Sequence, residues 1–140
     1  MAVSELFKYR IECVTPILCV KDMAKSLAFY VDILGFKKAE WGDENFTSIN
    51  QDNTGLYLCK GGQGFPGTWI WIVIDGDIFS LFQLLKSKGV TVRLPPTNFS
   101  WAYEMQVEDP DGHILRFGTD PNDQEKYLDK QKANGDAPPA

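Results

Sequence analysis

The sequence has little of what several common kinds of functional site require. Its 140 residues include one histidine, His113, and three cysteines, Cys13, Cys19 and Cys59, without C-x-x-C spacing. A metal site with two histidine ligands therefore cannot form within one chain. The odd number of cysteines, each inside an apolar or alternating run, is typical of reduced, buried thiols in a cytosolic protein and not of a disulfide framework.

Long apolar runs and an excess of positive charge are also missing. No apolar stretch approaches the ~20 residues that a membrane-spanning helix needs. The first ten residues carry charge instead of the apolar core of a signal peptide. The net charge of −5 argues against nucleic acids and anionic membranes as partners. We therefore expect a cytoplasmic protein whose acidic surface serves solubility or suits a neutral or cationic ligand.

The chain does contain a repeated pattern, a strand-like apolar run followed by an amphipathic helix. The first helix is predicted to begin at Asp22 and end at Gly35, and the second to begin between Asp75 and Asp77 and end at Gly89. Aspartate is a favourable N-cap, and glycine adopts the left-handed conformation that commonly ends a helix. The apolar runs that precede the two helices cover residues 15–20 and 68–74.

Two blocks downstream of the helices align without a gap. Residues 46–61 (FTSINQDNTGLYLCKG) and 103–118 (YEMQVEDPDGHILRFG) are 57 positions apart, whereas Gly35 and Gly89 are 54 apart. The second copy therefore has about three extra residues, which we place within 94–98. Asp-Pro-Asp-Gly and its counterpart Asp-Asn-Thr-Gly have the residues of tight turns, so each block is predicted to be a β-hairpin. His113 follows the turn and is expected at the hairpin surface.

The repeat predicts an α+β fold of two tandem βαβββ modules whose curled mixed sheets surround a cleft. One helix can cover one face of four strands, so the other face must be buried against the other module or a second chain. Such a concave space is a common place for a pocket. The predicted parts are an N-terminal extension over 1–10, modules over 11–62 and 63–118, and a polar tail over 119–140 that is frayed or forms a loose final helix.

Strand alternation assigns residues to the two faces of each sheet. On this assignment the tryptophans of the second apolar run belong to the core. The residues expected on the cleft face are Thr15, Ile17, Tyr57, Cys59, Thr68, Ile70, Ile114 and Arg116. Those expected under the helices are Leu18, Val20, Leu58, Trp69, Trp71, Val73 and Leu115.

Three features together resemble a known family. They are the repeat, the motif V-x-D-x-x-x-S-x-x-F-Y-x-x-x-L-G-F over 20–36, and the motif D-P-D-G-x-x-x-x-F over 109–117. They resemble the glyoxalase/bleomycin-resistance/dioxygenase family, also called vicinal oxygen chelate proteins, over residues 11–118. The resemblance implies paired βαβββ modules and a homodimer. It also implies, for the enzymes of the family, a divalent metal held by one residue from the first and last strand of each module.

The positions that the resemblance assigns to metal ligands lack the familiar His, Gln and Glu. A guanidinium repels a cation, hydroxyls are weak ligands, and one thiol falls short of the three ligands that a catalytic metal needs. A shift of one residue in the first strands would give Pro16 and Trp69, which bind no metal either. We therefore expect no metal, no cofactor and no catalytic residue. The four positions are Thr15, Cys59, Thr68 and Arg116.

The closer resemblance is to the metal-free bleomycin-resistance branch of the family. The aromatic strand over 68–73 is similar to that branch, and Trp-Ala-Tyr-Glu-Met over 101–105 resembles its W-G-R-E-F signature, with departures at Ala102, Tyr103 and Met105. The resemblance implies a protein that binds a flat, cationic ligand of the bleomycin type by stacking aromatic rings in a dimer cleft. The protein would then sequester a small molecule without catalysis.

Alternatives remain open at this stage. One is a lyase or dioxygenase-related enzyme of the superfamily acting on an unknown metabolite, and another is a metabolite-binding regulatory module. Arg116 can bind a ligand carboxylate, pair with Glu104 or bridge the modules, while Glu104 can bind a cationic ligand or face solvent. Aromatic residues at the cleft rim can stack on a ligand or pack between subunits. The candidate ligand-binding residues are Trp101, Tyr103, Glu104, Arg116, Tyr57, Trp41, Phe46, Thr15 and Thr68.

Overall fold

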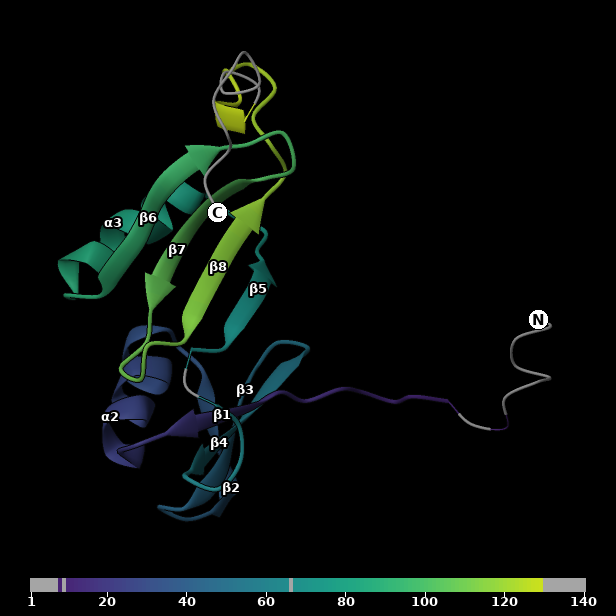
Figure 1. Ribbon diagram of the computed structural model, residues 1–140, viewed down its shortest axis with the longest axis vertical. Helices are drawn as coiled ribbons and strands as arrows, with labels where there is room; N and C mark the ends of the chain where they lie inside the picture. Colours follow the sequence, from purple (N-terminus) through teal and green to yellow (C-terminus); the bar gives the residue numbers. More distant parts are fainter. Residues whose placement is uncertain (1–7, 9, 66, 130–140) are drawn as a thin grey trace.

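The computed structural model describes residues 8, 10–65 and 67–129. Within them the chain forms two four-stranded sheets, which Figure 1 shows one above the other. The first module contains β1 (Ile17–Val20), α2 (Met23–Leu27), η1 (Ala28–Ile33), β2 (Lys37–Gly42), β3 (Phe46–Gln51) and β4 (Thr54–Lys60). The second contains β5 (Trp69–Val73), α3 (Ile78–Ser87), β6 (Thr91–Asn98), β7 (Tyr103–Glu108) and β8 (Ile114–Thr119). The predicted α+β fold of two tandem βαβββ modules is confirmed.

The two sheets have the same topology. Their strand orders are β1-β4-β3-β2 and β5-β8-β7-β6, with the first and last strands of each module parallel and the other pairs antiparallel. The hairpins β3–β4 and β7–β8 are those predicted from the aligned blocks. In β6 the pairing register shifts twice between Val92 and Thr97, so bulges accommodate the extra residues of the second copy.

The helices begin and end where the sequence predicts. The Asp22 carboxylate accepts a hydrogen bond from the Lys25 backbone N–H at 3.1 Å, and Asp77 accepts one from the Phe79 N–H at 3.2 Å. Gly35 follows the first helix at a φ of 88°. The helix that starts as α2 continues as the π-helical segment η1, and both lie on the same face of the first sheet.

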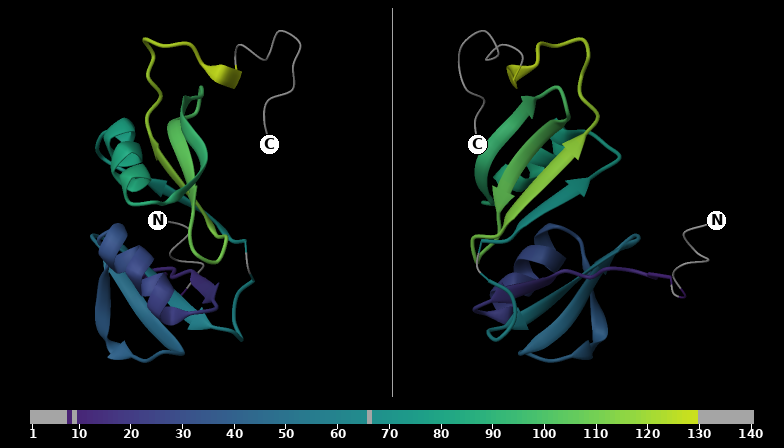
Figure 2. Two further views of the ribbon diagram at one scale, coloured as in Figure 1. Left: turned by 90° about the vertical axis from the view of Figure 1, so that its left-hand side faces the viewer. Right: turned by 45° about the vertical axis from the view of Figure 1, so that its right-hand side comes forward.

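One hydrophobic core extends through both modules. Figure 2 shows α2 and α3 each against one face of its own sheet, and no other described element covers the opposite faces. The core therefore lies between helix and sheet, and each sheet keeps one uncovered face. Fully buried core side chains include Leu18, Leu58, Ile78, Leu85, Met105 and Leu115.

Strand β5 presents its side chains opposite to the prediction. Trp69 and Trp71 are half-exposed on the uncovered face, while Ile70 and Ile72 pack against the core. Trp69 pairs with Ile114 and Ile17 pairs with Tyr57, so β5 corresponds to β1 at an offset of 52 residues (69 − 17), one less than the 53 (75 − 22) between Asp22 and Asp75. Because side chains alternate along a strand, that single residue reverses the face of every side chain in β5. The Val73 side chain also lies on the uncovered face instead of under the helix, and Thr68 lies before the strand begins.

The Asp-Pro-Asp-Gly turn joins the second module to the first. The Tyr30 hydroxyl, inside the first module, donates a hydrogen bond to Asp109 at 2.8 Å. Burial and the Asp109 carboxylate raise the pKa of Tyr30 well above its ordinary value. Asp111 accepts hydrogen bonds from the Lys21 backbone N–H at 2.9 Å and the Ser26 hydroxyl at 3.3 Å. The sequence pattern of this turn predicts only a tight local turn, but its two aspartates form hydrogen bonds with the first module. The turn is therefore part of the interface between the modules.

His113 is fully buried at this interface, so the expectation of a surface hairpin residue was wrong. Its Nδ1 accepts a hydrogen bond from the Thr68 N–H at 3.0 Å, which leaves the proton on Nε2 to donate to the Cys19 carbonyl at 2.7 Å. Its backbone N–H donates to Asp109 at 2.8 Å. The imidazole thus holds together the start of β5 and the end of β1.

The two ends of the described chain differ in their contacts with the body of the protein. The Asn98 side chain exchanges two hydrogen bonds of 2.8 Å with the Asn122 backbone, and Ser100 donates two to Asp129, so the tail is attached as far as residue 129. Residues 130–140 and most of the predicted extension over 1–10 lie outside the described residues. Figure 1 shows the segment before β1 running away from the body, with Ile11 and Val14 exposed.

Two further expectations can be compared with the structure. Cys19 is half-buried and Cys59 is buried, but Cys13 is exposed in the segment before β1, so the expectation of three buried thiols was wrong for Cys13. All three cysteines are free thiols. Among the residues that the structure describes, no helix has the length and apolar character needed to cross a membrane.

Candidate functional site

The uncovered face of the second sheet is built around the carboxylate of Glu104, which is 1% exposed. Arg116 donates to it twice, from Nε at 2.9 Å and from Nη2 at 2.7 Å. Trp101 donates from its indole nitrogen at 2.8 Å, and Gln106 from its amide at 3.1 Å. Each carboxylate oxygen therefore accepts two hydrogen bonds, and both partners of the Arg116–Glu104 ion pair are held in one geometry.

These donors keep Glu104 charged. Burial alone raises the pKa of the carboxyl, but the hydrogen bonds from Arg116, Trp101 and Gln106 outweigh burial and hold its pKa below the ordinary value. The hydrogen bond to Glu104 likewise raises the pKa of Arg116. Glu104 is thus neither a solvated residue nor free to accept further donors, because its oxygens are already occupied.

Two guanidinium groups lie over tryptophan rings on the same face. The Arg116 guanidinium carbon is 4.7 Å from the ring centre of Trp71, and that of Arg93 is 4.6 Å from the ring centre of Trp69. Arg93 also donates a hydrogen bond to the side-chain oxygen of Gln106. Stacking of this kind holds both arginines flat against the sheet.

Close packing sets the positions of the exposed rings. A Cβ atom at Gly118 would lie 2.4 Å from the Trp71 ring, so glycine at this position of β8 leaves the space that the indole occupies. Trp101 stacks on Phe99 with ring centres 4.5 Å apart and planes 7° from parallel. We call this surface the Trp–Arg face, formed by Trp69, Trp71, Arg93, Trp101, Glu104, Gln106 and Arg116.

The first module has an aromatic cluster on its uncovered face. Trp41 stacks on Phe46 at 6.3 Å, and Tyr57 contacts both rings at 5.8 and 5.3 Å. Cys59 is paired with Phe46 in the sheet and donates its thiol hydrogen to the Gly61 carbonyl at 2.9 Å. Three of the candidate residues from the first half of the sequence therefore lie together, but in a module separate from the Trp–Arg face.

Three candidates lie apart from both groups. Tyr103 alternates with Glu104 and so faces the α3 side of the sheet, where burial, Glu125 and Asp77 raise its pKa. Thr15 precedes β1, and Thr68 precedes β5 with its hydroxyl donating to a loop carbonyl. The structure does not bring these three to the Trp–Arg face.

Four members of the Trp–Arg face were missed from the sequence. Gln106 follows Glu104 by two residues, so simple alternation along the strand was a usable signal for it. Trp69 and Trp71 could be placed on this face only once the pairing of β5 with β8 was known. Arg93 lies within the bulged part of β6, where alternation is interrupted, and no sequence signal places it.

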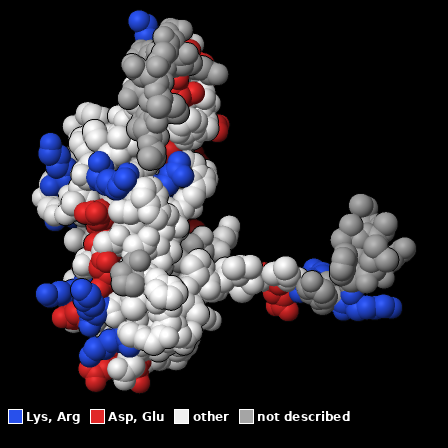
Figure 3. Space-filling view, in the orientation of Figure 1, with Lys and Arg blue, Asp and Glu red and all other residues white. Residues whose placement is uncertain are grey.

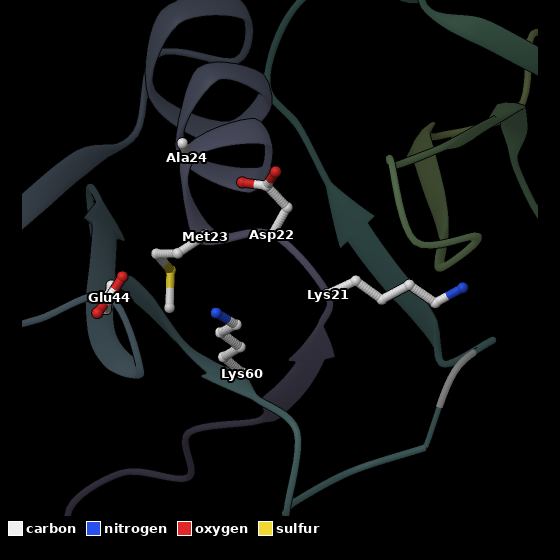
Figure 4. Close-up of a pocket in the computed structure, with 6 residues that line it drawn as sticks. All are labelled: Lys21, Asp22, Met23, Ala24, Glu44 and Lys60. Atoms are coloured by element: carbon white, nitrogen blue, oxygen red, sulfur yellow. The ribbon is translucent and has the colours of Figure 1, made fainter.

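Two hollows in the surface lie away from the Trp–Arg face. One is lined by Lys21, Asp22, Met23, Ala24, Glu44 and Lys60; Figure 4 shows Met23, Glu44 and Lys60 converging while Lys21 points away. Another is lined by Gly35, Lys37, Asn50, Gln51 and Asp52. Neither includes a candidate binding residue. The Trp–Arg face lies outside both of these hollows.

The four positions assigned to metal ligands do not fit a divalent metal. Arg116 is engaged by Glu104, the Cys59 thiol donates to a backbone carbonyl, and Thr15 and Thr68 lie outside the strands. In the described segments no three His, Cys, Asp or Glu side chains are grouped as ligands. The arrangement offers stacking, apolar contact and N–H donors from guanidinium groups.

Paired βαβββ modules with uncovered, aromatic sheet faces define a class of small-molecule-binding proteins. The chain belongs to the Glyoxalase/Bleomycin resistance protein/Dioxygenase superfamily, whose model matches residues 10–117. No curated protein matches the chain in sequence. The superfamily resemblance seen in the sequence is thereby confirmed.

Solved structures share the fold at low identity. The antibiotic binding protein TnmS3 from Streptomyces sp. CB03234 is 23% identical with a TM-score of 0.69, covering 81% of this chain and 99% of its own. Lactoylglutathione lyase from Agrobacterium tumefaciens is 13% identical with a TM-score of 0.65, covering 79% and 95%. An integron cassette protein from the mobile metagenome of Halifax Harbour Sewage Outfall is 26% identical with a TM-score of 0.67, covering 78% and 99%.

Proposed function

We propose that this protein binds and sequesters a flat aromatic small molecule, of the kind found among antibiotics, without catalysing a reaction. The observation that carries the proposal is the exposure of its tryptophans. All four lie on the uncovered sheet faces or at their rim, and Trp41, Trp69, Trp71 and Trp101 are 51%, 50%, 44% and 52% exposed. Tryptophan is usually largely buried, and exposed aromatic groups mark binding surfaces.

The state of the titratable groups supports a non-catalytic role. A general base needs a free acceptor near the reacting proton and a pKa near the working pH. Glu104 has four donors on its carboxylate and a lowered pKa. His113 has both ring nitrogens engaged by the backbone. A metal-dependent lyase of this superfamily would need ligands at Thr15, Cys59 and Thr68, where the donor set does not fit.

The similarity to TnmS3 is a further support for the antibiotic class of ligand, although at 23% identity it concerns the fold. Bleomycin is the first antibiotic to test because the sequence resembles the bleomycin-resistance branch. The regulatory alternative requires the same binding face, so it differs from sequestration in its consequences in the cell and not in the site.

Titration calorimetry with bleomycin and with a flat aromatic probe, anthracene carboxylate, tests the proposal. We expect saturable heat with at least one of them, together with quenching of tryptophan fluorescence. Trp101→Ala should weaken binding about tenfold, since stacked aromatic residues are the commonest sites of large binding energy. Phe79→Ala is the control, because Phe79 is an exposed aromatic residue on α3, on the helix side of the second sheet. Absence of heat with both compounds at high protein concentration would contradict the proposal.

We also propose that the protein is a homodimer in which the ligand lies in a cleft between the sheet faces of the two chains. Support comes from the exposed tryptophans and from the apolar side chains of Ile11, Val14 and Phe65, which are exposed in the segment before β1 and in the loop before β5. Light scattering should give about twice the chain mass of 15.8 kDa. Replacing Ile11 and Val14 by aspartate should lower that mass toward one chain. A single-chain mass for the unaltered protein at high concentration would rule the dimer out.

A further inference from the structure

We infer that the Trp–Arg face selects planar ligands that have an acidic group, and discriminates against planar cations. This inference rests on the proposed function, and it goes further by giving the charge of the ligand. The resemblance to bleomycin-binding proteins implies a cationic ligand, whereas this inference gives an anionic one.

The carboxylate of Glu104 is not available to a cationic ligand. Its two oxygens already accept four hydrogen bonds, and the side chain is almost completely buried beneath Arg116, Trp101 and Gln106. A cation approaching the face would have to displace Arg116 to reach it. Because a bidentate guanidinium–carboxylate pair is strong and well oriented, this exchange gains little.

The guanidinium of Arg93 is a positive charge on this face that no ion pair neutralises among the described residues. Arg116 is neutralised by Glu104, but Arg93 is exposed and forms no ion pair with any carboxylate in the described part of the chain. Its hydrogen-bond partner is the neutral amide of Gln106, and the ring beneath it is that of Trp69. An exposed guanidinium held flat on an indole offers N–H donors at the edge of a stacking surface. A ring that stacks on the neighbouring tryptophans can thus place an acidic substituent against Arg93.

One acidic side chain also lies on this face. Glu108 follows Gln106 by alternation and is half-exposed at the end of β7, but among the described residues it forms no ion pair with Arg93. In the space-filling view, Lys and Arg atoms lie over the upper sheet, with acidic atoms close below them and others farther up the molecule (Figure 3). A local preference for anions can therefore exist on a chain whose net charge is −5.

The test compares three anthracene derivatives of the same ring and similar size. They are anthracene carboxylate, aminomethyl anthracene, which is a cation at neutral pH, and hydroxymethyl anthracene, which is neutral. Calorimetry at moderate salt should show the carboxylate binding about tenfold more tightly than the ammonium compound, the effect expected of one partly exposed charge-assisted hydrogen bond. The neutral compound should lie between them.

The variant Arg93→Met identifies the source of the selection. Methionine keeps an apolar chain over Trp69 and removes the charge, so we expect the carboxylate to lose about tenfold in affinity while the neutral compound is little changed. A purely structural role for Arg93 would instead weaken all three compounds alike. Lys86→Met on α3 is the control, because Lys86 is also a cation over an aromatic ring, that of Phe82, but lies on the helix side of the sheet.

The outcomes separate the inference from the proposed function. If the ammonium compound binds as tightly as the carboxylate or more tightly, the inference is wrong and the proposed function stands. If Arg93→Met prefers the carboxylate over the ammonium compound as strongly as the unaltered protein does, the selection does not arise at Arg93 and the inference is overturned. If none of the three compounds binds and bleomycin also fails, both the inference and the proposed function are refuted.

Discussion

Replacing Arg116 by methionine is expected to destabilise the protein by about 3 kcal/mol at neutral pH, the lower end of the cost of breaking a buried ion pair. The reason is that Glu104, 1% exposed, would keep its charge with no cation beside it. The lower end applies because the Arg116 side chain is 32% exposed and its charge is partly screened. Urea unfolding followed by circular dichroism measures the change.

The pH dependence of this variant makes the prediction specific. In the unaltered protein the pKa of Glu104 is lowered below its ordinary value of 4.5, so its contribution to stability is present above pH 4.5 and is lost as the pH falls through the folded-state pKa. Without Arg116, burial is the dominant influence and the carboxyl becomes easier to protonate. The stability difference between variant and unaltered protein should therefore shrink as the pH approaches about 4.

A double variant provides the control. Adding Glu104→Gln to Arg116→Met removes the buried charge at similar size, and the amide oxygen keeps an acceptor for Trp101 or Gln106, so part of the lost stability should return at neutral pH. A difference that is constant between pH 4 and pH 7, or a double variant less stable than Arg116→Met, would contradict the assignment of Glu104 as a buried charge neutralised by Arg116.

Replacing Asp109 by alanine is expected to cost about 3 kcal/mol of unfolding free energy, because several buried donors would lose one acceptor. The Asp109 carboxylate accepts hydrogen bonds from the Tyr30 hydroxyl and from the backbone N–H groups of Asp111 and His113, each at 2.8 Å. Tyr30 and His113 are fully buried. Thermal unfolding and urea unfolding should both show the loss as one transition, since the two modules share a core.

Two matched variants separate the interface from the turn itself. Tyr30→Phe removes one hydrogen bond between the modules and is expected to cost about 1 kcal/mol. Asp52→Ala changes the equivalent turn of the first module, which is exposed and has its aspartate at a φ of 52°, and should also cost about 1 kcal/mol. If Asp109→Ala cost no more than Asp52→Ala, the second turn would be a local feature and not an interface between modules.

Elements with local signals could be predicted from the sequence. Asp22 and Asp77 cap their helices through their own side chains, and Gly35 adopts a positive φ, so these boundaries depend on residues close in sequence. The two hairpins follow from turn residues and alternating runs. The repeat then relates one module to the other without knowledge of any contact between them.

The candidate site could be predicted in part. Trp101, Glu104 and Arg116 lie together as members of one face, and Trp41, Phe46 and Tyr57 lie together on another. The uncovered face of β5 was assigned wrongly because alternation defines two faces but not which one meets the core, and an error of one residue exchanges them. The pairing of Trp69 with Ile114 decides the matter, and that pairing is between residues 45 positions apart.

The sequence by itself determined the superfamily, the two tandem modules and the replacement of the usual metal ligands, since each depends on residue type and on spacing along the chain. The tertiary structure alone decided that Glu104 is saturated by its donors, that Arg93 forms no ion pair among the described residues, and that His113 is buried between the modules. These are properties of neighbours distant in sequence. Charge, burial and hydrogen bonding of a side chain are set by what surrounds it, and strand pairing brings those surroundings together.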